Sequence, residues 1–168
     1  MKLLLVRHGI AEVRDVFRAT GKPDEERPLT EEGRSKMARV ALGLRELVPE
    51  LDLIASSPLV RAQQTASIVA DAYGMKVGAT TNALNPDALL SDLVEWTASR
   101  GADEVIATVG HEPHLSILVT WFLCGVEESR VVFKKGGAAL LEFRGRPRKG
   151  GAVLRWLESP KTLRRLAK

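Results

Sequence analysis

One local pattern occurs three times in this sequence: a short apolar run, an abrupt turn with polar residues, and then a segment with helical periodicity. The three runs are residues 3–6, 51–55 and 105–109. An apolar run bounded by polar residues is typical of a strand covered on both faces, as in a parallel sheet. Because strands alternate with helices along 168 residues, the sequence predicts a three-layer α/β/α sandwich with a mainly parallel central sheet.

The other elements follow from apolar spacing and from capping residues. Thr30, followed by two glutamates, is expected to cap the first long helix, and Ser57, followed by Pro58, the second. Helices are expected at 30–48, 57–73, 86–101, 113–124 and 160–166, and further strands at 75–80, 138–143 and 152–157. Residues 11–28 are expected to form a loop that leaves the first strand and lies over its carboxyl end.

Length and composition limit the class of protein. A chain of 168 residues with 45% hydrophobic content predicts a single domain, residues 1–168. No apolar stretch has the length of a membrane span, and the N-terminus lacks a secretory pattern. The one cysteine, Cys124, is expected to be a small buried hydrophobe in a helix. A cytoplasmic protein with no membrane association is therefore expected.

The charge is unevenly distributed along the chain. Residues 130–168 contain twelve lysines and arginines, against Glu142 and Glu158 only, although the net charge of the whole chain is +4. This basic quarter could bind an anionic partner, or it could be a solvated face that aids solubility. Aromatic residues make up 5% and are not interleaved with the basic ones, which argues against nucleic acid as a partner.

Polar residues follow each of the three apolar runs. Arg7 and His8 follow the first, Arg61 lies about one turn into the helix after the second, and His111 follows the third. Ligands in open α/β sheets bind beyond the carboxyl ends of the strands. We therefore expect Arg7, His8, Arg61 and His111 to meet at one edge of the sheet.

Two arginines and two histidines favour a tetrahedral phosphate as the ligand. Arginine donates paired hydrogen bonds to phosphate oxygens, and a neutral histidine is a competent nucleophile. A metal site built on the three histidines is the competing interpretation. Arg7 beside them would repel a cation, and no carboxylate is evidently paired with them, so no metal and no other cofactor is expected.

Three blocks together resemble the histidine phosphatase superfamily, which includes the phosphoglycerate mutases. They are Leu5-Val6-Arg7-His8-Gly9, residues 57–65 and residues 109–113. Residues 27–33 and 156–161 are similar to stretches of the compact SixA-type phosphohistidine phosphatases. The resemblance covers nearly the whole chain and implies a phosphoglycerate mutase-like fold without a large lid insertion, and hence a shallow, open site.

The resemblance implies roles for individual residues. His8 would be the nucleophile that becomes phosphorylated, and Arg7, Arg61 and His111 would bind the phosphoryl oxygens. Arg27 would be an accessory residue of the site. The implied substrate is a histidine-phosphorylated protein of a phosphorelay or phosphotransfer type, and the implied reaction is hydrolysis without a metal. His114 is expected to face solvent or to bond a backbone group.

The general acid of the wider superfamily has no evident counterpart here. Many members place a glutamate in the stretch that corresponds to residues 83–87, and this sequence has none there. SixA-type proteins share this lack, and a phosphohistidine leaving group needs an acid less than an alkoxide does. Glu12, Asp87 and Glu112 are the stand-in candidates.

Three alternatives remain open at this point. The chain could be a general or small-molecule phosphomonoesterase of the same superfamily. It could be a phosphoglycerate mutase, which the chain length and the missing glutamate disfavour. It could also be a non-catalytic module that binds phosphate or a phosphoprotein, although such a module would need the arginines and not His8.

Overall fold

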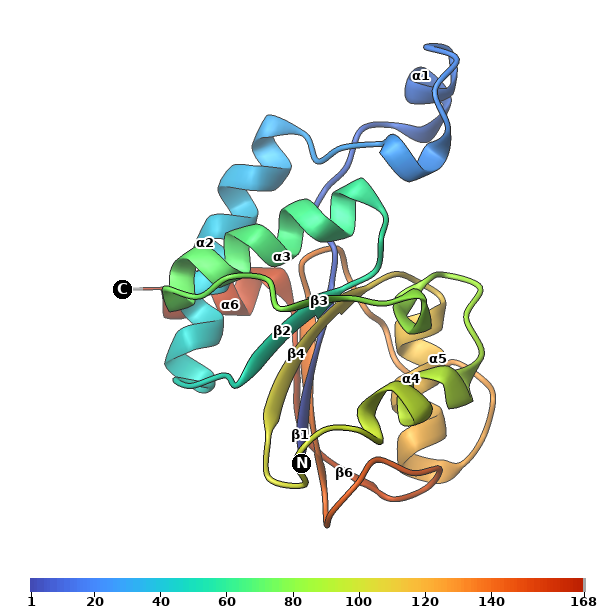
Figure 1. The fold of residues 1–168 in the computed structure, drawn as a ribbon. Helices are drawn as coiled ribbons and strands as arrows, with labels where there is room; N and C mark the ends of the chain where they lie inside the picture. The colour runs from blue at the N-terminus through green and yellow to red at the C-terminus, as the bar shows by residue number, and fades with distance from the viewer. Residues whose placement is uncertain (168) are drawn as a thin grey trace.

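The computed structural model describes residues 1–167, which form a six-stranded sheet with helices on both faces (Figure 1). The strand order is β3-β2-β4-β1-β5-β6. The strands are β1 (Lys2–Arg7), β2 (Leu53–Ser56), β3 (Ala79–Thr80), β4 (Val105–Gly110), β5 (Ala138–Phe143) and β6 (Ala152–Glu158). The first four are parallel, β5 is antiparallel to β1, and β6 is antiparallel to β5. The predicted α/β class and mainly parallel sheet are confirmed.

The helices form the two outer layers. One layer holds α2 (Glu31–Leu47), α3 (Val60–Tyr73) and α6 (Pro160–Leu166), and the other holds α4 (Leu90–Thr97) and α5 (His114–Cys124) (Figure 1). The short helix α1 (Arg14–Arg18) and the 3-10 turn η1 (Asp24–Glu26) follow β1, and the 3-10 turn η2 (Asn82–Leu84) follows β3. Helix α1 stands out from the sheet layers, beyond the carboxyl end of β1 (Figure 1).

The central strand β1 is buried on both faces, as its unbroken apolar run predicts. Leu3 and Leu5 pack into the core with Phe122 of α5, and Leu4 and Val6 pack into the core on the α2 side. Burying each such side chain contributes about 1.5–3 kcal/mol. Alternate side chains of β1 therefore pack into the two hydrophobic cores on opposite faces of the sheet, and this fixes the strand that ends at Arg7.

The predicted start of the second long helix is wrong. Helix α3 begins at Val60 with Leu59 as its N-cap, and Ser57 does not cap it. The Ser57 hydroxyl instead lies 2.6 Å from Nε2 of His111. A buried imidazole offers this hydroxyl a partner in the interior, and residues 57–59 remain an extended link between β2 and α3.

Three further predictions need correction. The strand predicted at 75–80 is limited to β3 (Ala79–Thr80). Helix α4 is shorter than the predicted range 86–101, because Asp92 accepts a hydrogen bond from the backbone N–H of Leu89 at 3.0 Å and this contact marks the helix start. Cys124 is helical as predicted, but it is exposed, since it is the last residue of α5 before Gly125 turns the chain. Within residues 1–167 no helix is long and apolar enough to cross a membrane.

Candidate active site

The strand register brings the three predicted turns together at the carboxyl edge of the sheet. Arg7 pairs with Gly110 at the end of β1 and β4, and the backbone N–H of His8 donates to the Gly110 carbonyl at 3.1 Å. The Ser57 N–H donates to the Val109 carbonyl at 3.1 Å. Adjacent ends of β2, β4 and β1 therefore place Ser57, His8 and His111 next to one another.

His8 is held in one protonation state. Its side chain is 6% exposed, and Nδ1 lies 2.7 Å from the Gly9 carbonyl oxygen. A carbonyl oxygen only accepts, so Nδ1 carries the proton and Nε2 of the neutral ring has a free lone pair. Burial lowers the pKa of His8 to about 3, with further lowering by the charges of Arg61 and Arg7 and an opposing effect of the Gly9 hydrogen bond. At neutral pH His8 is therefore an uncharged imidazole with one lone pair available.

His111 lies against His8. The two ring centroids are 5.0 Å apart with the ring planes tilted by 51°. Besides the contact of Nε2 with Ser57, Nδ1 of His111 is buried and has no partner among residues 1–167. Burial, followed by the charge effects of His8 and Arg61, holds the pKa of His111 far below its usual value. A buried ring nitrogen without a partner is rare and points to a missing ligand.

Arg7 and Arg61 complete the predicted cluster. Arg61 is 3% exposed, whereas Arg7 is partly exposed and donates from Nη1 to the Phe133 carbonyl. The Nε atom of each is buried without a partner in the described part of the chain. Burial is the largest cause that lowers the pKa of both groups. Guanidinium groups stay charged at physiological pH, so the buried Arg61 and the partly exposed Arg7 each bring a positive charge and a free Nε donor to the site.

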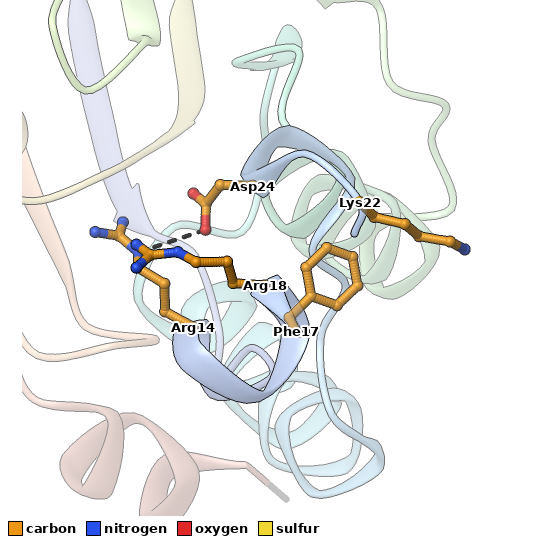
Figure 2. A pocket seen from close by; sticks show the side chains of 5 residues that line it. All are labelled: Arg14, Phe17, Arg18, Lys22 and Asp24. Atoms are coloured by element: carbon orange, nitrogen blue, oxygen red, sulfur yellow. Dashed lines mark ion pairs between the residues drawn. The ribbon is translucent and has the colours of Figure 1, made fainter. Parts of the chain in front are cut away.

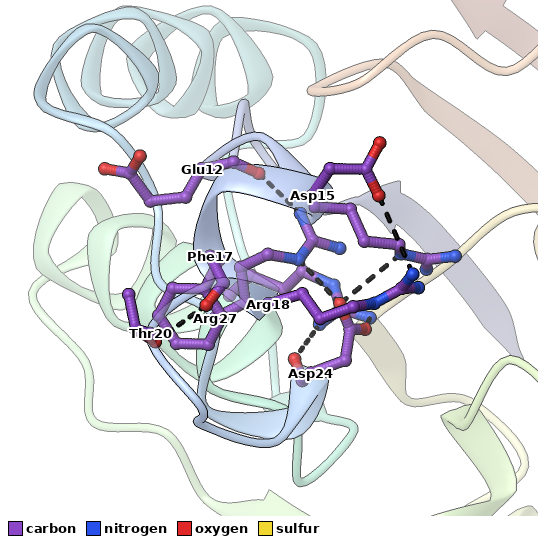
Figure 3. A network of polar contacts seen from close by, with 9 residues as sticks. Glu12, Asp15, Phe17, Arg18, Thr20, Asp24 and Arg27 are labelled. Atoms are coloured by element: carbon purple, nitrogen blue, oxygen red, sulfur yellow. Dashed lines mark hydrogen bonds and ion pairs between the residues drawn. The ribbon is translucent and has the colours of Figure 1, made fainter.

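Asp24 joins the arginines of the site, which the sequence did not predict. Its carboxylate lies 2.7 Å from Nε of Arg27, 3.2 Å from Nη2 of Arg61 and 3.4 Å from Nε of Arg14 (Figure 3). Burial alone raises the pKa of Asp24, but the Arg27 hydrogen bond and the charges of Arg61, Arg27 and Arg14 lower it. Arg27, predicted as an accessory residue, is 7% exposed and also donates to the Glu12 carbonyl at 2.8 Å.

The loop over the site makes it less open than predicted. No large insertion covers the pocket, but His8, Arg61 and His111 are each at most 6% exposed. Asp24 reaches Arg61 from the 11–28 segment. The loop that leaves β1 therefore covers part of the site, through the contacts of Asp24 with Arg61.

The 27–33 block holds the chain that follows His8. The backbone N–H of Thr30 donates to the Ile10 carbonyl at 3.0 Å, and the Thr30 hydroxyl accepts from the Gly33 N–H at 2.9 Å as the predicted cap of α2. Two residues of α3 add to this hold: Gln64 accepts from the Leu29 N–H at 2.8 Å, and Thr65 accepts from the Gly9 N–H at 3.0 Å. The polar residues around Arg61 thus fix the backbone around His8.

Replacing Gly33 with alanine is expected to destabilise the protein by about 2–4 kcal/mol, against the usual helix preference for alanine of about 1 kcal/mol. A Cβ at this position would lie 2.0 Å from the Ile10 carbonyl oxygen, so backbone must move. Urea unfolding measures the effect. Ser35→Ala, an exposed change in the same helix, is the matched control and should alter stability little. Equal stabilities of Gly33→Ala and the wild type would contradict the close approach.

Lys135 is a further cation of the site that the sequence analysis missed. It lines a pocket together with Arg7, and its pKa is lowered by burial and by the charges of Arg7, Arg27 and Arg61. It precedes Gly136, whose N–H donates to the carbonyls of Arg7 and His8 at 3.1 Å each. Because β5 is antiparallel to β1, the amino end of β5 lies at the same edge of the sheet as the carboxyl end of β1. The sequence feature that could have indicated Lys135 is the Lys134-Lys135 pair before two glycines.

The three carboxylate candidates lie in different surroundings. Glu112 accepts from the N–H and the hydroxyl of Ser116, at 3.0 and 2.8 Å, and so stabilises the first turn of α5. The Glu12 carboxylate points away from Asp24 in Figure 3. Asp87 lines a separate pocket with His114. Within residues 1–167 none of the three has a hydrogen bond or ion pair with His8 or Arg61, but the charge of Glu112 acts on Arg7 and raises the pKa of that guanidinium against the effect of burial.

His114 differs from both of its predicted environments. It is 3% exposed, and both ring nitrogens lack a hydrogen-bond partner within residues 1–167. It lies at the first position of α5, three residues after His111, and packs beneath the segment that precedes α4. Burial lowers its pKa, and the charges of Asp92 and Asp87 partly oppose this. Across residues 1–167, no group of three or more His, Cys, Asp or Glu side chains is arranged as a metal site.

Acidification is expected to destabilise the protein before carboxylates are protonated. His8 and His111 have folded-state pKa values below the unfolded value of 6.5, so the unfolded state binds more protons as pH falls from about 6.5. Together they should lower the free energy of unfolding by about 2–3 kcal/mol between pH ~7.5 and pH ~5.5. Urea unfolding at the two pH values measures this, and His111→Asn should reduce the loss. Equal stabilities at both pH values would contradict two buried neutral histidines.

The fold and the cluster together define a class of protein. A mainly parallel sheet ends in a neutral histidine, two buried arginines, a second neutral histidine and further cations. Such a site is suited to a phosphoryl group next to a nitrogen nucleophile.

Comparison with known proteins gives the family. Residues 3–84 match the model of the histidine phosphatase superfamily (branch 1). An uncharacterized protein of Picosynechococcus sp. is 35% identical over 141 residues, which is 82% of each chain. The chain therefore belongs to the histidine phosphatase superfamily, as the three sequence blocks predicted.

Solved structures show the same fold. The protein histidine phosphatase SixA, solved with tungstate, has a TM-score of 0.81 at 23% identity and covers 97% of this chain and 99% of its own. A phosphoserine phosphatase of Entamoeba histolytica, solved with phosphoserine, has a TM-score of 0.63 at 18% identity, covering 96% of this chain and 98% of its own. The compact SixA-like fold is confirmed, and the same fold is used for more than one phosphorylated substrate.

Proposed function

We propose that this protein hydrolyses protein phosphohistidine through a phosphorylated His8. The observation that carries the proposal is the Nδ1 contact of His8 with the Gly9 carbonyl at 2.7 Å, in a ring whose pKa is lowered to about 3. This contact leaves the Nε2 lone pair of His8 free, in a ring on which the charges of Arg61 and Arg7 both act. The family and the likeness of the fold to SixA support a phosphatase of this kind.

The residues of the site suit a two-step transfer. In the first step Nε2 of His8 attacks phosphorus, the P–N bond of the substrate breaks, and the substrate imidazole, already protonated on its other ring nitrogen, leaves as a neutral ring with the electron pair of that bond. In the second step water attacks the phosphorus of phospho-His8, and inorganic phosphate leaves as Nε2 regains its lone pair. Arg7, Arg61 and His111 hold the phosphoryl oxygens in both steps, and Arg27 and Lys135 add positive charge.

The lack of an evident general acid favours phosphohistidine over an ester. An alkoxide must be protonated as it leaves, whereas the imidazole of phosphohistidine can already carry a proton. Asp24 is the carboxylate nearest the arginines, and its lowered pKa keeps it ionised. Glu112 is engaged by Ser116. The general phosphomonoesterase is the second candidate, because the phosphoserine phosphatase shares the fold.

Phosphate release from paired substrates distinguishes the two functions. The purified protein, in chelator, is given a histidine-phosphorylated carrier protein, phosphoserine and p-nitrophenyl phosphate. We expect kcat/KM for phosphohistidine to exceed that for phosphoserine by about 100-fold or more, since the serine alkoxide lacks an acid to protonate it, whereas p-nitrophenolate leaves without one and so reports on the nucleophile. Faster hydrolysis of the esters would favour the phosphomonoesterase. Phosphate binding without turnover on any substrate would indicate a binding module.

A further inference from the structure

A small cationic pocket opens beside the proposed phosphoryl site. Its volume is about 250 Å³, and it is lined by Arg14, Phe17, Arg18, Lys22 and Asp24 (Figure 2). Asp24 is shared with the active site, because the same carboxylate contacts Arg61 and Arg27. A group in this pocket would therefore be close to a phosphoryl group held by Arg61.

Helix α1 builds this pocket with one face. Arg14, Phe17 and Arg18 are three and four residues apart, so they share a side of the helix. Figure 2 shows Arg14 and Arg18 directed toward the end of the pocket where Asp24 lies, with the Phe17 ring as a wall. Arg14 and Arg18 are thus brought together beside Asp24, and Lys22 lines the pocket on the other side of Phe17 (Figure 2).

The positive charge of the pocket is only partly neutralised. Arg14 contacts Asp24 at 3.4 Å, a carboxylate that two other arginines already share. Arg18 is 3.8 Å from Asp15, and both side chains are more than three-quarters exposed. Lys22 has no ion pair within residues 1–167. A surface pocket with such an excess of cations is complementary to a carboxylate-rich partner.

Two exposed valines lie at α1, one at its N-cap and one within the helix. Val13 and Val16 are 65% and 63% exposed, on a helix that stands out beyond the end of β1 (Figure 1). Two exposed valines outside the pocket would not contact a small phosphorylated molecule. A protein surface can cover the valines and contact the pocket at the same time. The arrangement therefore favours a macromolecular partner.

We infer that the α1 pocket binds acidic side chains that flank the phosphohistidine of the substrate protein. This inference rests on the proposed function and adds a preference within it. Arg18 and Lys22 supply the attraction, Phe17 packs against the aliphatic part of the bound side chain, and Asp24 keeps the pocket joined to Arg61. The partner is a phosphohistidine protein with glutamates or aspartates around the modified residue.

Two synthetic phosphohistidine peptides test the inference. They differ only at the residues that flank phosphohistidine, which are glutamates in one and glutamines in the other, and phosphoramidate serves as a substrate without flanks. The wild type should prefer the glutamate peptide by about tenfold in kcat/KM, and this preference should shrink at high salt. In Arg18→Glu/Lys22→Glu the preference should disappear, with the rate on phosphoramidate unchanged.

A charge-reversal variant far from the α1 pocket serves as the control. Arg144→Glu/Arg146→Glu reverses two charges in the β5–β6 turn, at the opposite edge of the sheet, and should keep the tenfold preference. Equal rates of the wild type on both peptides, or a preference that survives in Arg18→Glu/Lys22→Glu, would overturn the inference alone. A wild type that releases no phosphate from either peptide would contradict the proposed function, and the inference with it.

Discussion

Replacing His8 with alanine is expected to lower kcat/KM on phosphohistidine substrates by about 10⁴-fold or more, since removing a nucleophile leaves only the binding groups of a site. The proposed reaction passes through a bond between Nε2 of His8 and phosphorus. Phosphate release measures the loss. Rapid quenching of the wild type should also give an acid-labile phosphate that mass spectrometry locates on His8.

The matched control for this change is His114→Gln. His114 is a buried histidine three residues after His111, so its replacement disturbs the same region without removing the proposed nucleophile. This variant should retain most of the activity. Residual activity of His8→Ala within about tenfold of the wild type would contradict a covalent mechanism through His8, because such a loss is too small for a missing nucleophile.

Replacing Arg61 with alanine is expected to have the next largest effect, about 10³-fold in kcat/KM. Arg61 is 3% exposed, its Nε has no partner within residues 1–167, and its Nη atoms bind the backbone and side chain of Asp24. Removal takes away donors to the transferred phosphoryl group and leaves Asp24 with a less compensated charge next to the anion. Steady-state kinetics on phosphohistidine substrates measure the effect.

Arg61→Lys separates charge from geometry. Lysine keeps the positive charge but lacks the planar fork, so its kcat/KM should lie between those of the wild type and Arg61→Ala. Urea unfolding of both variants checks that the fold is retained. Wild-type kinetics in Arg61→Ala would show that this side chain does not contact the phosphoryl group, and the site would have to be reassigned to Arg7 and Lys135.

The site residues at the strand ends were predictable from sequence, because the carboxyl ends of parallel strands lie at one edge of a sheet. Arg7, His8 and His111 come directly after apolar runs, and parallel strands deliver such residues to one edge whatever the details of the loops. Arg61 was expected about one turn into the next helix, but α3 begins at Val60 and Arg61 is its second residue. The resemblance to a known family added the roles of these residues, which remain proposals.

Residues that reach the site from loops were missed for a physical reason. Asp24 and Lys135 lie in segments without periodic patterns, and only tertiary packing brings them to Arg61 and Arg7. Ser57 illustrates the reverse case, since its sequence context is that of a helix cap. The buried ring of His111 offers a competing partner at 2.6 Å, and the cap is not formed.

The strand order has a consequence for how this chain folds during synthesis. β1 is made first, but its neighbours are β4 and β5, which follow it by about a hundred residues or more. Contacts of such sequence separation slow folding, since a long loop must close before they form. The apolar strand β1 therefore stays unpaired while most of the chain emerges from the ribosome. The nascent protein is most prone to aggregation until β5 has paired with β1.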